Sequence, residues 1–155
     1  MLEEERKELN NFLAATFNAV LKLEETALKK SSYSDITIKE LQLLQVVYER
    51  GINGGDNTAG AIAREMKITP GTLTTAVKLL EKKGYLQRVQ DTKDKRSVHI
   101  LVTEKGEKAN IENLEFHGSM AESVSKILTE EEMTGFKKGL GSLVGFFKEM
   151  EKNNK

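Results

Sequence analysis

The spacing of apolar and polar positions predicts six helices and one pair of strands. Apolar residues recur every three or four positions through most of the chain, which is the period of an amphipathic helix, and they alternate with polar residues only between Tyr85 and Val102. We therefore predict a mainly α (α+β) fold. The expected helices cover about residues 3–29, 38–50, 59–66, 70–83, 104–126 and 130–152, and the expected strands cover residues 85–89 and 97–102.

Helix ends are marked by residues that satisfy free backbone groups. Thr37 and Thr129 each precede a glutamate by three residues, which is the spacing of a capping box. Thr69 is followed by Pro70, the one proline of the chain, at the first helical position, where its missing N–H costs nothing. Gly51 is expected just past the end of the second helix.

The stretch from Thr69 to Thr103 predicts a helix that can enter a DNA groove, followed by a hairpin. The helix ends at Gly84, and its apolar stripe leaves a face of small polar side chains. Threonine hydroxyls and methyls suit base edges and thymine methyls in a major groove. The candidate DNA contacts in this helix are Thr69, Pro70, Gly71, Thr72, Thr74, Thr75 and Lys78.

Positive charge gathers in the same stretch. Between Lys78 and Arg96 lie seven basic and three acidic residues, a net charge of +4, although the whole chain carries no net charge. Cations on a helix and hairpin that can enter DNA grooves favour contacts with the phosphate backbone. The predicted partner is therefore double-stranded DNA. A helix of this kind followed by a hairpin, or wing, is called a winged helix. The alternative interpretation is a winged-helix module for protein contacts, in which the charged hairpin is simply solvated.

The aromatic residues indicate an assembly. All six phenylalanines lie in the expected first helix and the last two. A winged module of this size closes its own core with Leu, Ile and Val, and a symmetric partner can bury the remaining apolar surface. We predict a single domain over residues 1–155, with a winged helix-turn-helix at 37–103 and dimerisation helices at 1–30 and 104–155. The homodimer would present two recognition helices to a palindromic operator.

Composition narrows the function class further. The chain has 155 residues, 38% of them hydrophobic, and no cysteine, which excludes disulfides and thiolate metal sites. No apolar run reaches membrane-spanning length and the N-terminus lacks a secretion signal, so we expect a cytoplasmic protein with no membrane partner. The glycine-rich loop at residues 52–57 lacks the lysine and spacing of a phosphate loop, which argues against nucleotide binding.

The sequence offers no constellation suited to catalysis or metal binding. His99 and His117 are far apart and favour packed or hydrogen-bonded roles over metal ligation. The acidic run from Glu130 to Glu132 is better explained as a helix start than as a catalytic pair. We therefore predict that the protein is not an enzyme and uses neither cofactor nor metal.

Residues 58–106 resemble the winged helix-turn-helix of the MarR family of bacterial transcriptional regulators. The wing pattern D-x-x-D-x-R stands as Asp91, Asp94 and Arg96, and the closing L-T-x-x-G stands as residues 102–106 with valine for leucine. The resemblance implies that Arg96 enters the minor groove and that Asp94 holds its guanidinium in place. Lys93 and Lys95 would then contact phosphates.

Three further segments resemble the MarR subgroup that represses fatty-acid synthesis genes (FabT-like). They are F-N-x-V-L-x-x-E-E at residues 17–25, D-I-T-I-K-E at 35–40 and F-H-x-x-M at 116–120. In that subgroup the co-repressor is a long acyl chain on acyl carrier protein, so the resemblance implies this ligand and partner. A crevice between the terminal helices and the second helix could hold the chain. The candidate walls, which also fit an ordinary core, are Phe12, Phe17, Leu44, Val47 and Phe116.

A second interpretation within the same family stays open. A repressor of this class could instead be released from DNA by a small aromatic or drug-like ligand that uses the same crevice.

Overall fold

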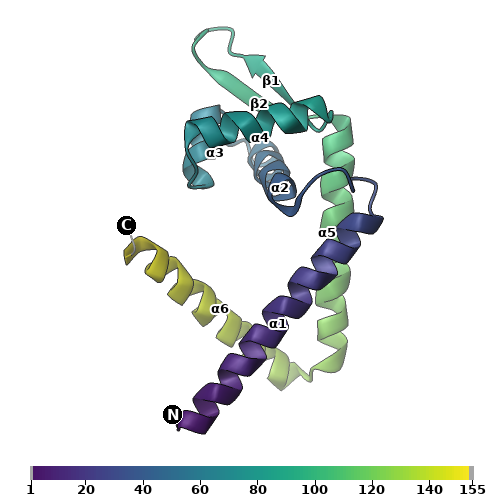
Figure 1. Cartoon of the computed structure of the whole chain (residues 1–155), viewed down its shortest axis with the longest axis vertical. Coiled ribbons are helices and arrows are strands. Elements are labelled where there is room, and N and C mark those ends of the chain that lie inside the picture. The colour runs from purple at the N-terminus through teal and green to yellow at the C-terminus, as the bar shows by residue number, and fades with distance from the viewer. Residues whose placement is uncertain (1, 154–155) are drawn as a thin grey trace. The chain divides into compact units, whose positions relative to one another are not determined.

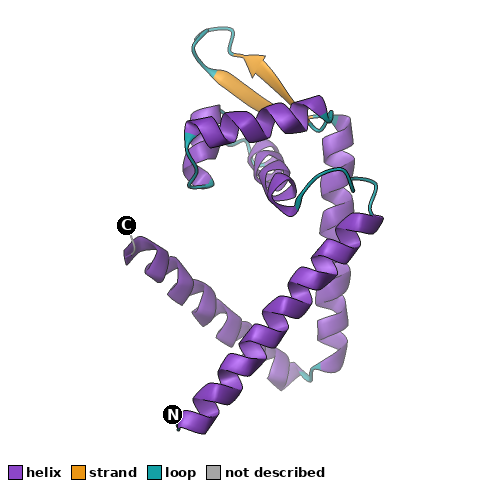
Figure 2. Ribbon diagram, in the orientation of Figure 1, coloured by secondary structure: helices purple, strands orange, loops and turns teal. Residues whose placement is uncertain are grey.

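The computed structural model describes residues 2–153 as a mainly helical chain with one small antiparallel sheet (Figures 1 and 2). This confirms the predicted fold class. The elements are α1 (Glu3–Lys30), α2 (Ile38–Ile52), α3 (Ala59–Glu65), α4 (Pro70–Lys82), β1 (Leu86–Gln90), β2 (Val98–Val102), α5 (Glu104–Ile127) and α6 (Glu130–Asn153). None of these helices is long and apolar enough to cross a membrane.

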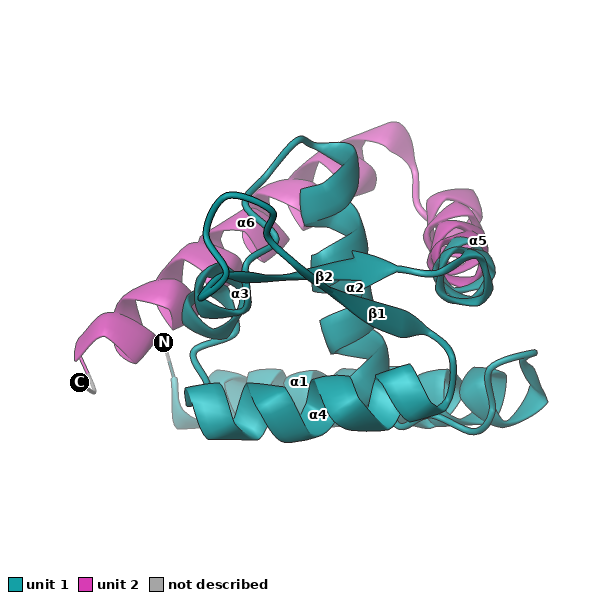
Figure 3. Cartoon of the chain, turned by 90° about the horizontal axis from the view of Figure 1, so that it is seen from above, with its two compact units in different colours: residues 1–113 teal, residues 114–155 magenta. Residues whose placement is uncertain are grey.

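The chain divides into two compact units inside α5, and each is described separately below (Figure 3). Unit 1 comprises residues 1–113 and therefore contains α1 to α4, the sheet and the first part of α5. Unit 2 comprises residues 114–155 and contains the remainder of α5 and α6.

The predicted caps form as expected. At the start of α2, the Glu40 backbone N–H donates to Thr37 Oγ1 at 3.2 Å, and the Thr37 N–H donates to Glu40 Oε2 at 2.7 Å. Thr129 and Glu132 make the same reciprocal pair at the start of α6. Because each cap lies within four residues of sequence, the helix starts follow from local chemistry.

Two predicted helix ends need correction. α2 does not stop before Gly51; it continues to Ile52, and the positive φ that ends this segment lies at Gly54 (φ 66°). Tyr85 is not the first residue of a strand. Its N–H donates to the Leu80 carbonyl at 2.9 Å while Gly84 adopts φ 83°, so both belong to a Schellman-type end of α4.

The two strands pair in the register Leu86↔Val102 to Gln90↔Val98. Both start one residue later than predicted, and β1 also ends one residue later. The pairing places Leu86 and Ile100 on the buried side of the hairpin. We call β1, β2 and the turn at residues 91–97 the wing.

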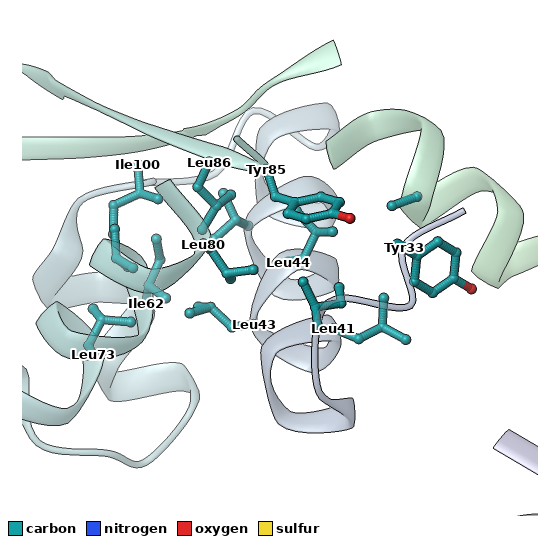
Figure 4. Close-up of a cluster of buried hydrophobic side chains, with 14 of the residues drawn as sticks. Tyr33, Leu41, Leu43, Leu44, Ile62, Leu73, Leu80, Tyr85, Leu86 and Ile100 are labelled. Atoms are coloured by element: carbon teal, nitrogen blue, oxygen red, sulfur yellow. The ribbon is translucent and has the colours of Figure 1, made fainter. Parts of the chain in front are cut away.

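The core of unit 1 lies where α2, α3, α4 and the hairpin meet (Figure 4). Leu44 and Val47 of α2, Ile62 of α3 and Leu80 of α4 are fully buried there. Tyr85 is also fully buried, directly after α4. The recognition module is thus closed by its own Leu, Ile, Val and Tyr side chains, as the position of the phenylalanines predicted.

Unit 2 has the opposite character, because α6 has no buried residue in the single chain. Its apolar side chains are spaced for one helical face, and most of them remain solvent-exposed. The exposed large apolar residues of α6 are Phe136, Leu140, Val144, Phe146, Phe147 and Met150.

Candidate nucleic-acid interface

A helix-turn-helix is formed by α3 and α4. Thr58 caps α3 by accepting the Ala61 N–H at 3.3 Å, and Thr69 caps α4 by accepting the Thr72 N–H at 3.2 Å. Between them Lys67 adopts φ 54°, and the Ile68 N–H returns to the Ala63 carbonyl at 3.1 Å. This tight turn brings α4 directly after α3, and α4 takes the place of a recognition helix.

α4 presents the predicted small polar face to solvent. Leu73, Val77 and Leu80 are buried on its inner side. The seven predicted contact positions of α4 and its cap are all exposed: Thr69, Pro70, Gly71, Thr72, Thr74, Thr75 and Lys78. Seen from above in Figure 3, α4 and the wing both face the viewer, so they lie on the same side of unit 1.

The threonine hydroxyls of this face are oriented by their own helix. Thr74 Oγ1 donates to the Pro70 carbonyl at 2.8 Å, and Thr75 Oγ1 donates to the Gly71 carbonyl at 3.1 Å. Each hydroxyl hydrogen is therefore engaged, while the oxygen lone pairs remain able to accept hydrogen bonds. Such oxygens, together with the γ-methyls, suit the amino groups and thymine methyls of a major groove.

The tip of the wing is shaped by carboxylates that cap its turn. Asp91 Oδ1 accepts the N–H groups of Lys93 at 2.7 Å and Asp94 at 2.9 Å. These backbone bonds are the largest cause of an Asp91 pKa lowered to about 2, with His99 also contributing. The carboxylate is therefore ionised at neutral pH, and its hydrogen bonds fix the turn that carries Lys93, Lys95 and Arg96 into solvent.

Asp94 contacts the backbone of Arg96. Its Oδ1 accepts the backbone N–H of Arg96 at 2.9 Å, and its carbonyl accepts the Ser97 N–H at 2.8 Å. Across residues 2–153, no ion pair joins the Asp94 carboxylate to the Arg96 guanidinium in this DNA-free chain. Asp94 thus sets the backbone from which Arg96 projects and leaves the guanidinium exposed.

Arg88 is a cation of this surface that the sequence reasoning did not place. Its Nε and terminal nitrogen contact Glu81 Oε2 at 2.9 and 2.7 Å, and these contacts are the main cause of a lowered Glu81 pKa. Arg88 and Thr74 also line a groove of about 140 Å³ between α4 and the wing. Arg88 lies two residues after Leu86 on β1 and pairs with Ile100. Since side chains alternate between the two faces of a strand, this spacing could have placed Arg88 on the face of the hairpin that packs toward α4.

The five predicted effector walls do not form one pocket within unit 1. Leu44 and Val47 are fully buried in the α2 core, whereas Phe12 and Phe17 are exposed on α1. Phe116 is half-buried and belongs to unit 2. Their joint role as a ligand site therefore stays a prediction.

A tight α3–α4 turn, an exposed polar recognition face and a hairpin with a cationic tip define a winged helix-turn-helix protein. The family model described as "MarR family" matches residues 36–98, which include α2, α3, α4 and most of the wing. The chain also resembles Streptococcus pneumoniae FabT in a crystal structure with DNA. The two are 34% identical with a TM-score of 0.85, and the match covers 94% of this chain and 99% of that one.

Two curated relatives from Bacillus subtilis (strain 168) are described as uncharacterized HTH-type transcriptional regulators. YkoM is 30% identical over 104 residues, or 67% of this chain, and YwhA is 29% identical over 94 residues, or 61% of this chain. In each case the match spans 65% of the relative's length. The chain belongs to the MarR family, whose members and structural neighbours here are transcriptional regulators rather than enzymes.

Proposed function

We propose that this chain is a transcriptional repressor that binds a palindromic operator on double-stranded DNA as a homodimer. The observation that carries the proposal is the exposed threonine face of α4 on the same side of unit 1 as the cationic wing tip. Likeness to a FabT structure bound to DNA, over nearly the whole chain, supports DNA as the partner.

The apolar faces of the terminal helices support the homodimer. α6 buries nothing in the single chain, and Phe12 and Phe17 of α1 are more than half exposed. Exposed apolar surface of this extent usually marks an interface, and a two-fold partner covers the same surface on both chains. Sedimentation at micromolar concentration should give a dimer. A folded monomer that binds a palindrome tightly would contradict the assembly.

The DNA proposal is tested by comparing two wing variants on a selected duplex across a salt series. Arg96→Ala should remove most of the specific affinity, since this residue is proposed to read the minor groove. Lys93→Ala should keep sequence preference and lower the salt slope by about one unit, as expected for a phosphate contact. Lys108→Ala is the control, because this exposed lysine pairs with Glu104 on α5, outside the proposed surface.

Equal and small losses for Arg96→Ala and Lys93→Ala would refute the assignment of roles within the wing. Wild-type protein that binds no duplex at low salt would instead favour the interpretation as a protein-interaction module. The two failures are distinguishable because only the second abolishes binding before any substitution is made.

For the effector, we propose a long acyl chain presented on acyl carrier protein, which would act as co-repressor of fatty-acid synthesis genes. The support is the FabT-like sequence of three segments and the 34% identity to FabT. The proposed walls are Phe12, Phe17, Leu44, Val47 and Phe116. An apolar tail gains about 25 cal/mol per Å² buried, but it changes operator affinity only by favouring one spacing of the recognition helices.

The effector proposal is tested by measuring operator affinity with and without long-chain acyl carrier protein at fixed salt. Co-repression predicts tighter binding with the acylated carrier and no change with the unacylated carrier. Unchanged or weaker binding would overturn it and favour release by a small aromatic or drug-like ligand. A thermal-shift screen of such compounds then provides the positive test of that alternative.

A further inference from the structure

Two threonines in the second turn of α4 can offer a partner only hydrogen-bond acceptors. The hydroxyls of Thr74 and Thr75 each donate their single hydrogen to a carbonyl four residues back, that of Pro70 at 2.8 Å and that of Gly71 at 3.1 Å. Both side chains are exposed. Turning either hydrogen toward DNA would break its bond within the helix. Each side chain therefore presents oxygen lone pairs and a γ-methyl group.

The first turn of α4 has a different polarity. Thr69 Oγ1 and Thr72 Oγ1 lie 2.8 Å apart, and Thr69 Oγ1 also accepts the Thr72 N–H at 3.2 Å. One hydroxyl hydrogen fills the contact between the two oxygens, so the other can be donated to a partner. A donor beside a helix N-terminus suits phosphate oxygens, which only accept hydrogen bonds. This turn is therefore suited to positioning the helix, and the second turn is left to read bases.

Gly71 leaves space on the same face as Thr75. The two residues are four positions apart and therefore lie one above the other on the helix. A Cβ at Gly71 would meet no heavy atom of the described residues within 4 Å, so packing inside the protein does not require a glycine here. Glycine is a poor helix former, but it allows the backbone to approach a ligand closely. A glycine at this position would let α4 bring Thr75 near base edges.

The polarity of these threonines distinguishes the bases of a major groove. Adenine and cytosine present an amino group there, whereas guanine presents two acceptors, and thymine adds a methyl group. An oxygen that can only accept a hydrogen bond fits the amino groups and meets the lone pairs of guanine unfavourably. The γ-methyl gains a contact only where a thymine methyl is present. Together the two groups fit an A·T pair.

We propose that Thr74 and Thr75 are specificity-determining residues, which accept hydrogen bonds from adenine N6 and contact thymine methyls beneath the second turn of α4. The inference rests on the proposed DNA-binding function and adds the kind of base pair that the helix reads. Loss of one neutral hydrogen bond corresponds to about a twofold to tenfold loss of affinity per half-site.

The test begins with duplexes that full-length protein selects from a random-sequence pool. Wild type should select an A·T pair at a position of each half-site where Thr74→Val or Thr75→Val no longer prefers it, since valine keeps the methyl shape and lacks the acceptor. Thr134→Val is the matched control, because Thr134 Oγ1 makes the same bond to the Glu130 carbonyl at 2.9 Å in α6. Thr134 lies two residues before Phe136 and so points away from the apolar face of that helix. This variant should select the wild-type sequence.

Base analogues placed at that position of the selected duplex identify the groups that are read. Purine lacks the N6 amino group of adenine, and it should weaken wild-type binding but leave Thr75→Val unaffected. 7-Deazaadenine keeps the amino group and lacks N7, and wild type should bind it as it binds adenine. Uracil in place of thymine should weaken wild type and should not affect Thr75→Ser, which lacks the γ-methyl. Affinities are measured by fluorescence anisotropy at constant salt.

Gly71→Ala provides a second variant that should fold normally, since its methyl has room in the protein. It should bind the selected duplex more weakly, and an unchanged affinity would overturn the close approach of α4. Selection of the same sequence by both valine variants, or a loss with 7-deazaadenine as large as that with purine, would overturn the acceptor role of the threonines. A wild type that selects no duplex would overturn the proposed function together with this inference.

Discussion

Gly106 offers a sharp test of packing at the wing base, by which we mean Tyr85 before β1 and residues 102–103 at the end of β2. A Cβ at this position of α5 would lie 2.3 Å from the Tyr85 carbonyl oxygen and 2.8 Å from Val102 Cγ1. The carbonyl cannot retreat freely, because it accepts the Thr103 N–H at 3.1 Å where the chain leaves β2 for α5. Gly106→Ala should therefore push α5 away from the wing base.

The magnitude follows from two opposing effects. Alanine gains about 1 kcal/mol over glycine inside a helix. Overpacking a close contact typically costs about 1–3 kcal/mol, and a clash with backbone belongs at or above the upper end. The expected net loss of unfolding free energy is about 2 kcal/mol, which lowers Tm by roughly 4–8 °C in a chain of this size.

The assay is denaturant unfolding followed by circular dichroism, with Gly118→Ala as the matched control. Gly118 lies in the same helix, and an added Cβ meets no heavy atom within 4 Å. The control should gain up to about 1 kcal/mol from helix propensity. Equal stability gains for both variants would refute the close packing of Gly106 against the wing base.

Three further predictions concern the ends of the recognition helix. Thr69→Ala should cost about 1 kcal/mol in denaturant unfolding, because it removes the α4 N-cap. Glu40→Gln should cost about 1 kcal/mol, since Glu40 is buried and both its oxygens lie 2.9 Å from Lys83 Nζ. Tyr85→Phe removes the hydroxyl bond to Asp35 that is the main cause of a lowered Asp35 pKa. Because the pKa of Asp35 is lowered in the folded state, its carboxylate stabilises the fold at pH values above its ordinary pKa of 3.8. This contribution is lost as the pH falls through the folded-state pKa. In Tyr85→Phe the free energy of unfolding should therefore decrease less on acidification, as measured by unfolding at a series of pH values.

Local features were the most predictable from the sequence. The caps at Thr37, Thr69 and Thr129 each involve groups within four residues, and periodicity identified the buried face of α4 before any tertiary contact was known. The wing pairing followed from alternation, with an error of one residue at the start of each strand. The error in β1 arose because Tyr85 is apolar and aromatic, which favours a strand, while its N–H completes the end of α4.

The backbone role of Asp94 was not predicted. The family resemblance implied that Asp94 holds the Arg96 guanidinium, which stays a prediction, but a short aspartate side chain also readily captures the N–H two residues ahead, and Asp94 does so. This local competition was available from the sequence. The partnership of Asp91 with His99 was not, because it depends on the strand register that brings position 99 opposite position 89.

The contacts that hold the C-terminal end of α4 could not be predicted from the sequence. Lys83 reaches Glu40 across 43 positions, and Tyr85 reaches Asp35 across 50. Lys105 of α5 joins the two, because its Nζ donates to the Lys83 carbonyl at 2.8 Å and lies 4.0 Å from the centre of the Tyr85 ring. Nothing in residue spacing specifies such pairs, since only the fold makes them neighbours.

These contacts give the two ends of the recognition helix different mechanical roles. The N-terminal turn is held by its own threonine cap and faces solvent, so it is available for a partner. The C-terminal end is tied to the start of α2 and to the first turn of α5 by charge-assisted bonds. A displacement of α2 or of the first turn of α5 must therefore carry α4 with it or break these bonds. An effector that acts on either helix would thus have a physical route to the residues that we propose to face DNA.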